Sequence, residues 1–198
     1  MASIFQKLEI DAFRAGITPR TKQSRDWFRN KVSDMRAGRM NRLQLMKADE
    51  LELVNKSQPL IGTMNMFFYD PKTKEQLPFY DRFPLAIIAG PAPGGFYGMN
   101  LHYLPPVLRA KFLDALMDIT NNNKYDETTR FRARYEVVRK VGGLRFYKPC
   151  FKHYLFAHVK SRLARVSAPE WEIATFLPTA QWEKSSAAQV YRDSRRKI

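Results

Sequence analysis

The residues best suited to chemistry are two aspartates and a histidine in the middle of the chain, Asp70, Asp81 and His102. Two carboxylates and a histidine are groups that general acid–base hydrolysis uses, so the trio would suit a small nuclease. Both aspartates, however, stand among Tyr and Pro residues, where an Asp side chain commonly accepts the backbone N–H bonds of a turn. The sequence offers no further supporting group for catalysis. We therefore expect the turn role and predict no catalytic residue.

Metal, nucleotide and cofactor chemistry find little support. Cys150 and His153 stand three residues apart on an expected helix, but His158 would face away from them and no CxxC or HExxH pattern accompanies the pair. The glycine patterns of phosphate-binding and dinucleotide-binding loops do not occur either. The sequence therefore predicts no metal site and no cofactor, and Cys150 is expected to be a small buried hydrophobe.

Positive charge is the strongest chemical feature. The chain has 34 Lys and Arg against 19 Asp and Glu, a net charge of +15. This charge divides into +5 for residues 1–58, zero for residues 59–105 and +10 for residues 106–198. A neutral middle with basic flanks is typical of a protein that contacts a polyanion, either DNA, RNA or an acidic protein surface.

The predicted contact residues are basic side chains of the last part of the chain. They are Arg130, Arg132, Arg134, Arg139, Lys140, Arg145, Lys148, Lys152, Arg195, Arg196 and Lys197. Aromatic residues stand between them, and these could stack on bases or belong to the core side of amphipathic elements. A basic face that is only solvated, or that is paired with an acidic neighbouring subunit, would have the same composition.

The elements that must position these residues follow from the apolar pattern. Helical spacing is found over residues 22–38, 106–120, 127–141, 148–166 and 169–176. Strands separated by Gly and Pro turns are expected over residues 60–69, 83–89 and 96–104. Short strands of this kind predict a small antiparallel SH3-like β-barrel or a curled sheet, hence an α+β fold with basic helices on both sides.

This pattern divides one compact unit into three parts. Residues 1–58 would form an N-terminal helical basic arm, residues 59–105 the small β-barrel and residues 106–198 a C-terminal helical basic region. The neutral, aromatic-rich surface of the barrel would suit docking to other subunits. We expect no membrane contact, because no window of the 198 residues approaches the length and apolarity of a transmembrane helix.

Several segments carry a family resemblance. They include Tyr69-Asp70-Pro71-Lys72, Leu77-Pro78-Phe79-Tyr80-Asp81, Asn100-Leu101-His102-Tyr103-Leu104-Pro105 and Glu170-Trp171-Glu172. The chain resembles a family of virion proteins of similar length from T-even-like myophages and marine phages, labelled DNA end-protector or head-completion proteins. The resemblance implies a virion component at the portal and neck, with a tail or baseplate position as the alternative, and it implies no catalytic residue.

Together these observations predict a non-enzymatic structural protein of a tailed-phage virion, located at the portal, neck or tail. It would be synthesised in the host cytoplasm and would contact double-stranded DNA or acidic virion proteins, in an oligomer set by the symmetry of the assembly. Two alternatives stay open. One is a phage nuclease that uses Asp70, Asp81 and His102, and the other is a free nucleic-acid-binding protein that never enters the particle.

Overall fold

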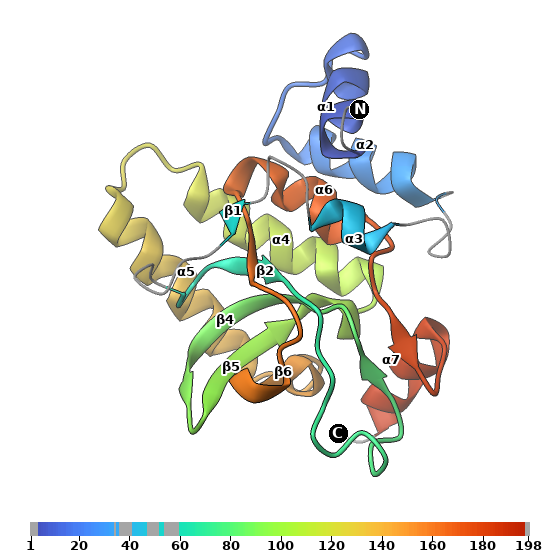
Figure 1. The fold of residues 1–198 in the computed structure, drawn as a ribbon. Helices are drawn as coiled ribbons and strands as arrows, with labels where there is room; N and C mark the ends of the chain where they lie inside the picture. The colour runs from blue at the N-terminus through green and yellow to red at the C-terminus, as the bar shows by residue number, and fades with distance from the viewer. Residues whose placement is uncertain (1–3, 34, 36–40, 47–51, 54–59, 197–198) are drawn as a thin grey trace.

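The computed structural model describes residues 4–33, 35, 41–46, 52–53 and 60–196 (Figure 1). The helices are α1 (Ile4–Arg14), α2 (Lys22–Ser33), α3 (Arg42–Leu45), α4 (Pro106–Thr120), α5 (Glu127–Gly142), α6 (Trp171–Phe176) and α7 (Ala187–Arg196). The strands are β1 (Glu52–Leu53), β2 (Met64–Met66), β3 (Tyr80–Asp81), β4 (Leu85–Ala92), β5 (Gly95–Asn100), β6 (Phe151–Leu155), β7 (Ala164–Val166) and β8 (Trp182–Glu183). Four short 3-10 turns complete the described part: η2 (Leu101–Tyr103), η3 (Lys148–Cys150), η4 (Phe156–His158) and η5 (Ala168–Glu170).

The main sheet is antiparallel and open. Its strands follow the order β1-β7-β2-β4-β5-β6, so the outer strands β1 and β6 do not pair, and β3 and β8 form a separate two-stranded sheet. The mixed helix-and-sheet class is therefore confirmed. The sheet is not closed, so the predicted SH3-like barrel is not confirmed, and neither are the basic helices on both sides of it. The segment 59–105 supplies only β2, β4 and β5 to this sheet, too few to close a barrel, and the other three strands come from the segments on either side. The three-part division of the chain stays a prediction.

The helix expected over residues 148–166 is also wrong. This segment forms η3, β6, η4 and β7, and β6 pairs with β5 in the register Met99↔Phe151 to Gly95↔Leu155. Phe151 packs on the core of the helical side, whereas Tyr154 belongs to the cluster on the opposite face of the sheet. Their spacing of three residues is close to one helical turn, which is why the sequence predicts a helix. In the structure the two side chains point to opposite faces of the sheet, because pairing with β5 makes this segment a strand.

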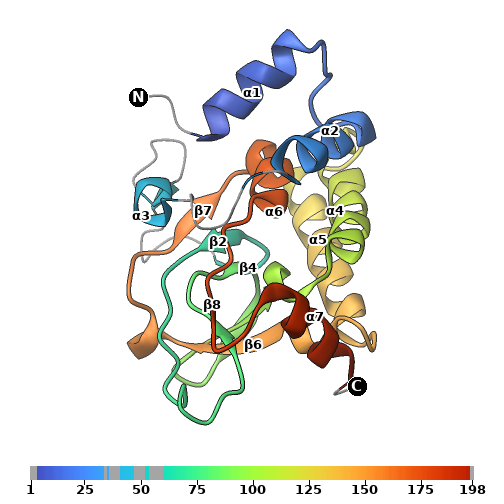
Figure 2. The same cartoon turned by 90° about the vertical axis from the view of Figure 1, so that its right-hand side faces the viewer.

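Both faces of the sheet are buried. Leu85 and Ile87 of β4 point to the large core formed with α4, α5 and α6, which lie together on one side of the sheet (Figure 2). Ala86 and Ile88, the alternate residues of the same strand, point to a smaller aromatic cluster on the other side. This alternation explains why β4 reads as a continuous apolar run in the sequence.

The pairing of β5 with β6 depends on Gly95. A Cβ atom added at Gly95 would lie 1.8 Å from the carbonyl oxygen of Tyr154, so another residue type cannot occupy this position without moving the strands apart. Gly98, three residues further along β5, faces the Tyr154 ring, which would lie 3.1 Å from an added Cβ. The two glycines thus set the place of β6, and with it the place of Lys152 and Tyr154.

Candidate nucleic-acid interface

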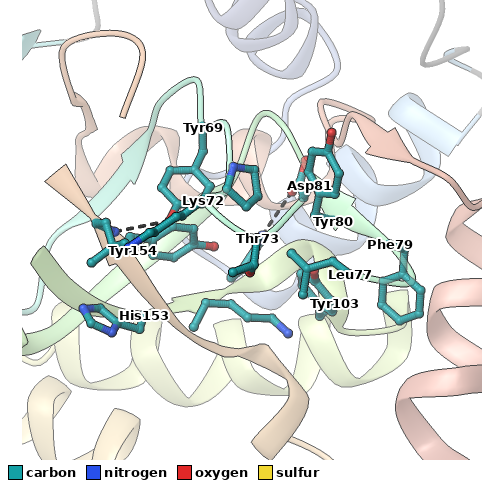
Figure 3. Close-up of a pocket in the computed structure, with 14 residues that line it drawn as sticks. Tyr69, Lys72, Thr73, Leu77, Phe79, Tyr80, Asp81, Tyr103, His153 and Tyr154 are labelled. Atoms are coloured by element: carbon teal, nitrogen blue, oxygen red, sulfur yellow. Dashed lines mark hydrogen bonds between the residues drawn. The ribbon is translucent and has the colours of Figure 1, made fainter. Parts of the chain in front are cut away.

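A hollow of about 280 Å³ opens beside the end of the sheet, and we call it the tyrosine hollow (Figure 3). It is lined by Tyr69, Pro71, Lys72, Thr73, Leu77, Phe79, Tyr80, Asp81, Asn100, Tyr103, Lys152, His153, Tyr154 and Leu155. These residues come from the loop between β2 and β3, from β3, from the end of β5 with η2, and from β6. Segments far apart in the sequence therefore build one aromatic and partly basic site.

The aromatic walls of the tyrosine hollow are held rigidly from behind. Tyr154 packs edge-to-face on Tyr69, with the ring centroids 4.9 Å apart, and also on Phe67 at 5.1 Å. On the other side, Tyr103 packs edge-to-face on Trp182 at 4.8 Å. Edge-to-face pairs of this kind fix the orientation of each ring. Tyr69, Tyr103 and Tyr154 are themselves buried, so only the part of each ring that borders the hollow forms its preformed aromatic lining.

The loop that carries Lys72 and Thr73 at the mouth is fastened at both of its ends. The backbone N–H of Asp70 donates to the carbonyl oxygen of His158 at 3.0 Å, and Nδ1 of His158 lies 2.8 Å from the Asp70 carbonyl oxygen. Further along, Nζ of Lys184 donates to the carbonyl oxygen of Lys74 at 2.7 Å. These hydrogen bonds fix both ends of the loop at the mouth of the hollow, while Lys72 and Thr73 themselves are exposed.

A buried chain of polar contacts lies behind one wall of the hollow, to which it contributes Asp81 and Asn100. Nδ1 of His102 lies 2.6 Å from Oδ2 of Asp81, and Nε2 of the same ring lies 3.1 Å from Oγ1 of Thr179. Nδ2 of Asn100 donates to the same Asp81 oxygen at 3.1 Å, while the backbone N–H groups of Phe83 and Gln181 both donate to Oδ1 at 3.0 Å. The Asp81 carboxylate therefore accepts four hydrogen bonds, and its side chain is 1% exposed.

The protonation states in this chain follow from burial and from these bonds. Burial lowers the pKa of His102 more than the neighbouring Asp81 raises it, so the ring is neutral near pH 7. Burial alone would raise the pKa of Asp81, but the His102 ring and the N–H donors hold it below its ordinary value. Asp81 is therefore an anion that accepts the Nδ1–H bond of His102, and the Thr179 hydroxyl donates to Nε2.

The structure brings together only part of the acid–base trio considered from the sequence. Asp81 and His102 are in contact, whereas Asp70 forms an ion pair with Lys74 at 3.2 Å and bonds through its backbone to His158. The turn role expected for Asp81 is present, because its side chain accepts the N–H of Phe83 two residues later. Both groups of the Asp81–His102 pair are almost wholly buried, which suits a contact that joins β3, η2 and the segment before β8.

A second hollow continues from the first toward α7, and we call the two together the groove. The second hollow has a volume of about 530 Å³ and shares Leu77, Phe79, Tyr103 and Lys152 with the tyrosine hollow. Its other lining residues are Pro78, Lys148, Pro149 and Ser194. Nζ of Lys152 lies 4.0 Å from the centroid of the Tyr103 ring, at the boundary between the two hollows. The groove therefore carries Lys72, Lys152 and Lys148 along an aromatic surface.

The predicted contact residues divide between the groove and α5. Lys148 and Lys152 line the groove, and exposed Arg196 follows Ser194 on α7. Exposed Arg145 lies between the end of α5 and η3. The side chain of Arg195 and all of Lys197 lie outside the described residues.

On α5 itself, Arg132, Arg139 and Lys140 are exposed, and Arg139 forms a surface ion pair with Glu136 at 3.4 Å. The other two are turned partly toward the protein. Nε of Arg130 donates to the carbonyl oxygen of Asn122 at 3.2 Å, and the guanidinium of Arg134 lies 5.7 Å from the centroid of the Trp171 ring. A role of this helix in contacting DNA or an acidic protein stays a prediction.

Sequence reasoning did not select Lys72, Tyr69 or Tyr103 as site residues. The zero net charge of residues 59–105 concealed the lysine, because the three acidic residues Asp70, Glu75 and Asp81 cancel the three basic residues of this segment in the sum. The density of Tyr, Phe and Pro around residues 69–81 is the available signal, but from sequence alone it favours turns and a protein-docking surface.

The metal-site candidates of the sequence are separated. Cys150 is buried, and burial raises the pKa of its thiol to about 12, so it is a neutral core group. Nε2 of His153 instead lies 2.9 Å from the carbonyl oxygen of Pro93. Among the residues that the structure describes, no group of three or more His, Cys, Asp and Glu side chains could hold a metal ion, and no helix could span a bilayer.

Comparison with known proteins gives one family. A family model described as Phage T4 terminal DNA protecting protein matches residues 6–195, almost the whole chain. No curated protein and no solved structure matches the chain.

Proposed function

We propose that this chain, which belongs to the family of the phage T4 terminal DNA protecting protein, binds the ends of linear phage DNA in its groove and shields them from exonucleases. The family has a DNA-protecting role, and it is the groove that suits a DNA end. The observation that carries the proposal is the combination of Lys72, Lys152 and Lys148 with preformed aromatic walls in one continuous surface.

The two halves of the groove suit different parts of a DNA end. Lysines bind phosphates without reading the sequence, so they hold the duplex regardless of its bases. Aromatic faces accept unpaired or terminal bases, which offer a π-surface that is covered inside a duplex. A protein seated on the last base pair would also occupy the position from which an exonuclease begins. The net charge of +15 would speed the encounter with DNA.

The remaining basic surface supports the finer parts of the proposal. Exposed Arg132, Arg139 and Lys140 on α5 lie outside the groove and would contact acidic virion proteins or further DNA at the portal, neck or tail. The role is one of binding rather than catalysis, because Asp81 and His102 are buried and joined to each other. Mass spectrometry of purified virions tests the location, and a Mg²⁺-dependent cleavage assay on linear DNA tests the nuclease alternative.

The decisive experiment compares a blunt linear duplex with a covalently closed circle of the same sequence, with and without an exonuclease. The protein should bind the linear form more tightly and protect it. Replacing Lys148 and Lys152 together by Gln should weaken binding and lower the slope of log affinity against log salt by about two, because about 0.9 of a counterion is released per neutralised phosphate.

The matched control replaces Lys111 and Lys124 by Gln. These two exposed lysines lie outside the groove, and the change in charge is the same. The control variant should keep the salt dependence of the native protein. Equal slopes for the two double variants, or equal affinity for linear and circular DNA, would contradict the proposal.

A further inference from the structure

We infer that the tyrosine hollow receives a single nucleotide, the last one of a DNA strand, turned out of the duplex with its base inside and its phosphate at the lysines. This inference rests on the proposed function and specifies how the end is recognised. It follows from the size, the walls, the polar groups and the charge of the hollow.

The size selects one base. A hollow of about 280 Å³ is large enough for a nucleobase, and the stacked duplex is far too wide to enter. A nucleotide can therefore reach the aromatic walls only if it leaves its partner. The last pair of a duplex is stacked on one side only, so opening it costs less than opening an internal pair.

The walls provide two sides for a base. Tyr69 and Tyr154 lie on one side of the hollow and Phe79 and Tyr103 on the other, and the labelled side chains of Figure 3 surround the space between them. The contacts of Tyr154 with Phe67 and of Tyr103 with Trp182 hold these rings in place before any ligand arrives. A preformed site of this kind loses little entropy when a base enters.

The polar groups determine which end of the nucleotide enters. Burial raises the pKa of the Tyr154 phenol, so its O–H stays protonated and can donate to a carbonyl or ring nitrogen of a base. The Asp81 anion behind Asn100 would repel a phosphate. The base should therefore lie inside, while the phosphate stays outside.

The charge at the mouth completes the arrangement. Lys72 is exposed on the loop at the rim, and Lys152 lies over Tyr103 where the hollow meets the second one. A phosphate attached to the inserted nucleoside would meet these ammonium groups, and the next phosphate of the strand would continue toward Lys148. The strand thus leaves the tyrosine hollow along the second hollow.

The test uses three duplexes that differ only in the last nucleotide of one strand: paired, mismatched, or abasic. The native protein should bind the mismatched end several-fold more tightly than the paired end, because no pair has to open. It should bind the abasic end about tenfold more weakly, because no base reaches the walls.

Two variants of the same loop make the test specific. Thr73→Trp places a large side chain at the mouth, and we expect it to bind all three ends with one lowered affinity. Gln76→Trp adds the same bulk at an exposed residue that does not line the hollow, and it should keep the order mismatched, paired, abasic. Equal affinity of the native protein for the three ends, with linear DNA still preferred over the closed circle, would overturn this inference alone. Loss of the preference for linear DNA would instead overturn the proposed function.

Discussion

At the residue scale, Asp81 is the side chain whose substitution we expect to destabilise the fold strongly. A turn residue alone would contribute little to stability, but the Asp81 carboxylate accepts four hydrogen bonds from three separate parts of the chain. Asp81→Asn removes the charge and places an amide N–H₂ where donors converge. We expect a loss of about 3 kcal/mol in the free energy of unfolding, measured by urea denaturation, because unpaired buried polar groups are costly.

Asp70→Asn is the natural control for that change. The Asp70 side chain forms a half-exposed ion pair with Lys74, and pairs of this kind contribute less than about 1 kcal/mol. A similar loss in both variants would mean that Asp81 acts only through its turn.

The buried His102 makes the stability of the fold depend on pH. Its pKa is lowered from the ordinary value of 6.5, mainly by burial, so below pH 6.5 the unfolded chain binds a proton that the folded chain binds less readily. The free energy of unfolding must therefore fall as the pH is lowered below 6.5. Asp81 adds a second loss as the pH falls through its folded-state pKa, which is lowered from 3.8.

Denaturation curves between pH 5 and pH 8 measure the contribution of His102. In His102→Gln the slope of stability against pH should flatten in this range, although the variant is less stable throughout. His153→Gln, a change of an exposed ring, should retain the native slope. A native protein whose stability is constant from pH 8 to pH 5 would contradict the prediction.

At the element scale, the pairing of β5 with β6 decides where the groove lies. Gly95→Ala should separate these strands, because the added methyl group would meet the Tyr154 carbonyl oxygen at 1.8 Å. We expect a loss of about 3 kcal/mol or more, of the size that overpacking causes, together with weaker DNA binding. Gly90→Ala on β4 is the control, since nothing lies within 4 Å of its added Cβ. Thermal unfolding of the two variants compares them, and equal melting temperatures would refute this account of β6.

Elements with a complete local pattern were predictable from the sequence. The helices expected over residues 106–120 and 127–141 correspond to α4 and α5, because each carries its own apolar stripe toward the core. The sheet could not be predicted in the same way. Its strands β1, β6 and β7 are short, and their partners lie far away in the sequence, so the local pattern of residues 148–166 resembled a helix.

At the scale of the whole molecule, the candidate site was predictable by residue type but not by geometry. The sequence selected Asp81 and His102 as possible companions, and they are in contact. It could not supply Thr179 or the aromatic walls, because these meet only through the tertiary fold. The basic flank pointed to a polyanion, but the groove combines Lys148 and Lys152 of that flank with Lys72 of the neutral segment, and a sum of charges along the chain cannot reveal that meeting.

The position of β7 has a consequence for how the protein is made. Ala164–Val166 lies between β1 and β2, so one of the last strands to be translated must enter between two of the earliest. Until residue 166 has left the ribosome, β7 is missing and one edge of β2 has no partner strand. This exposed edge can pair with other nascent chains. Because such distant pairings form slowly, over about milliseconds to seconds, the yield of active protein should depend on the pace of translation and on temperature as much as on the stability of the finished fold.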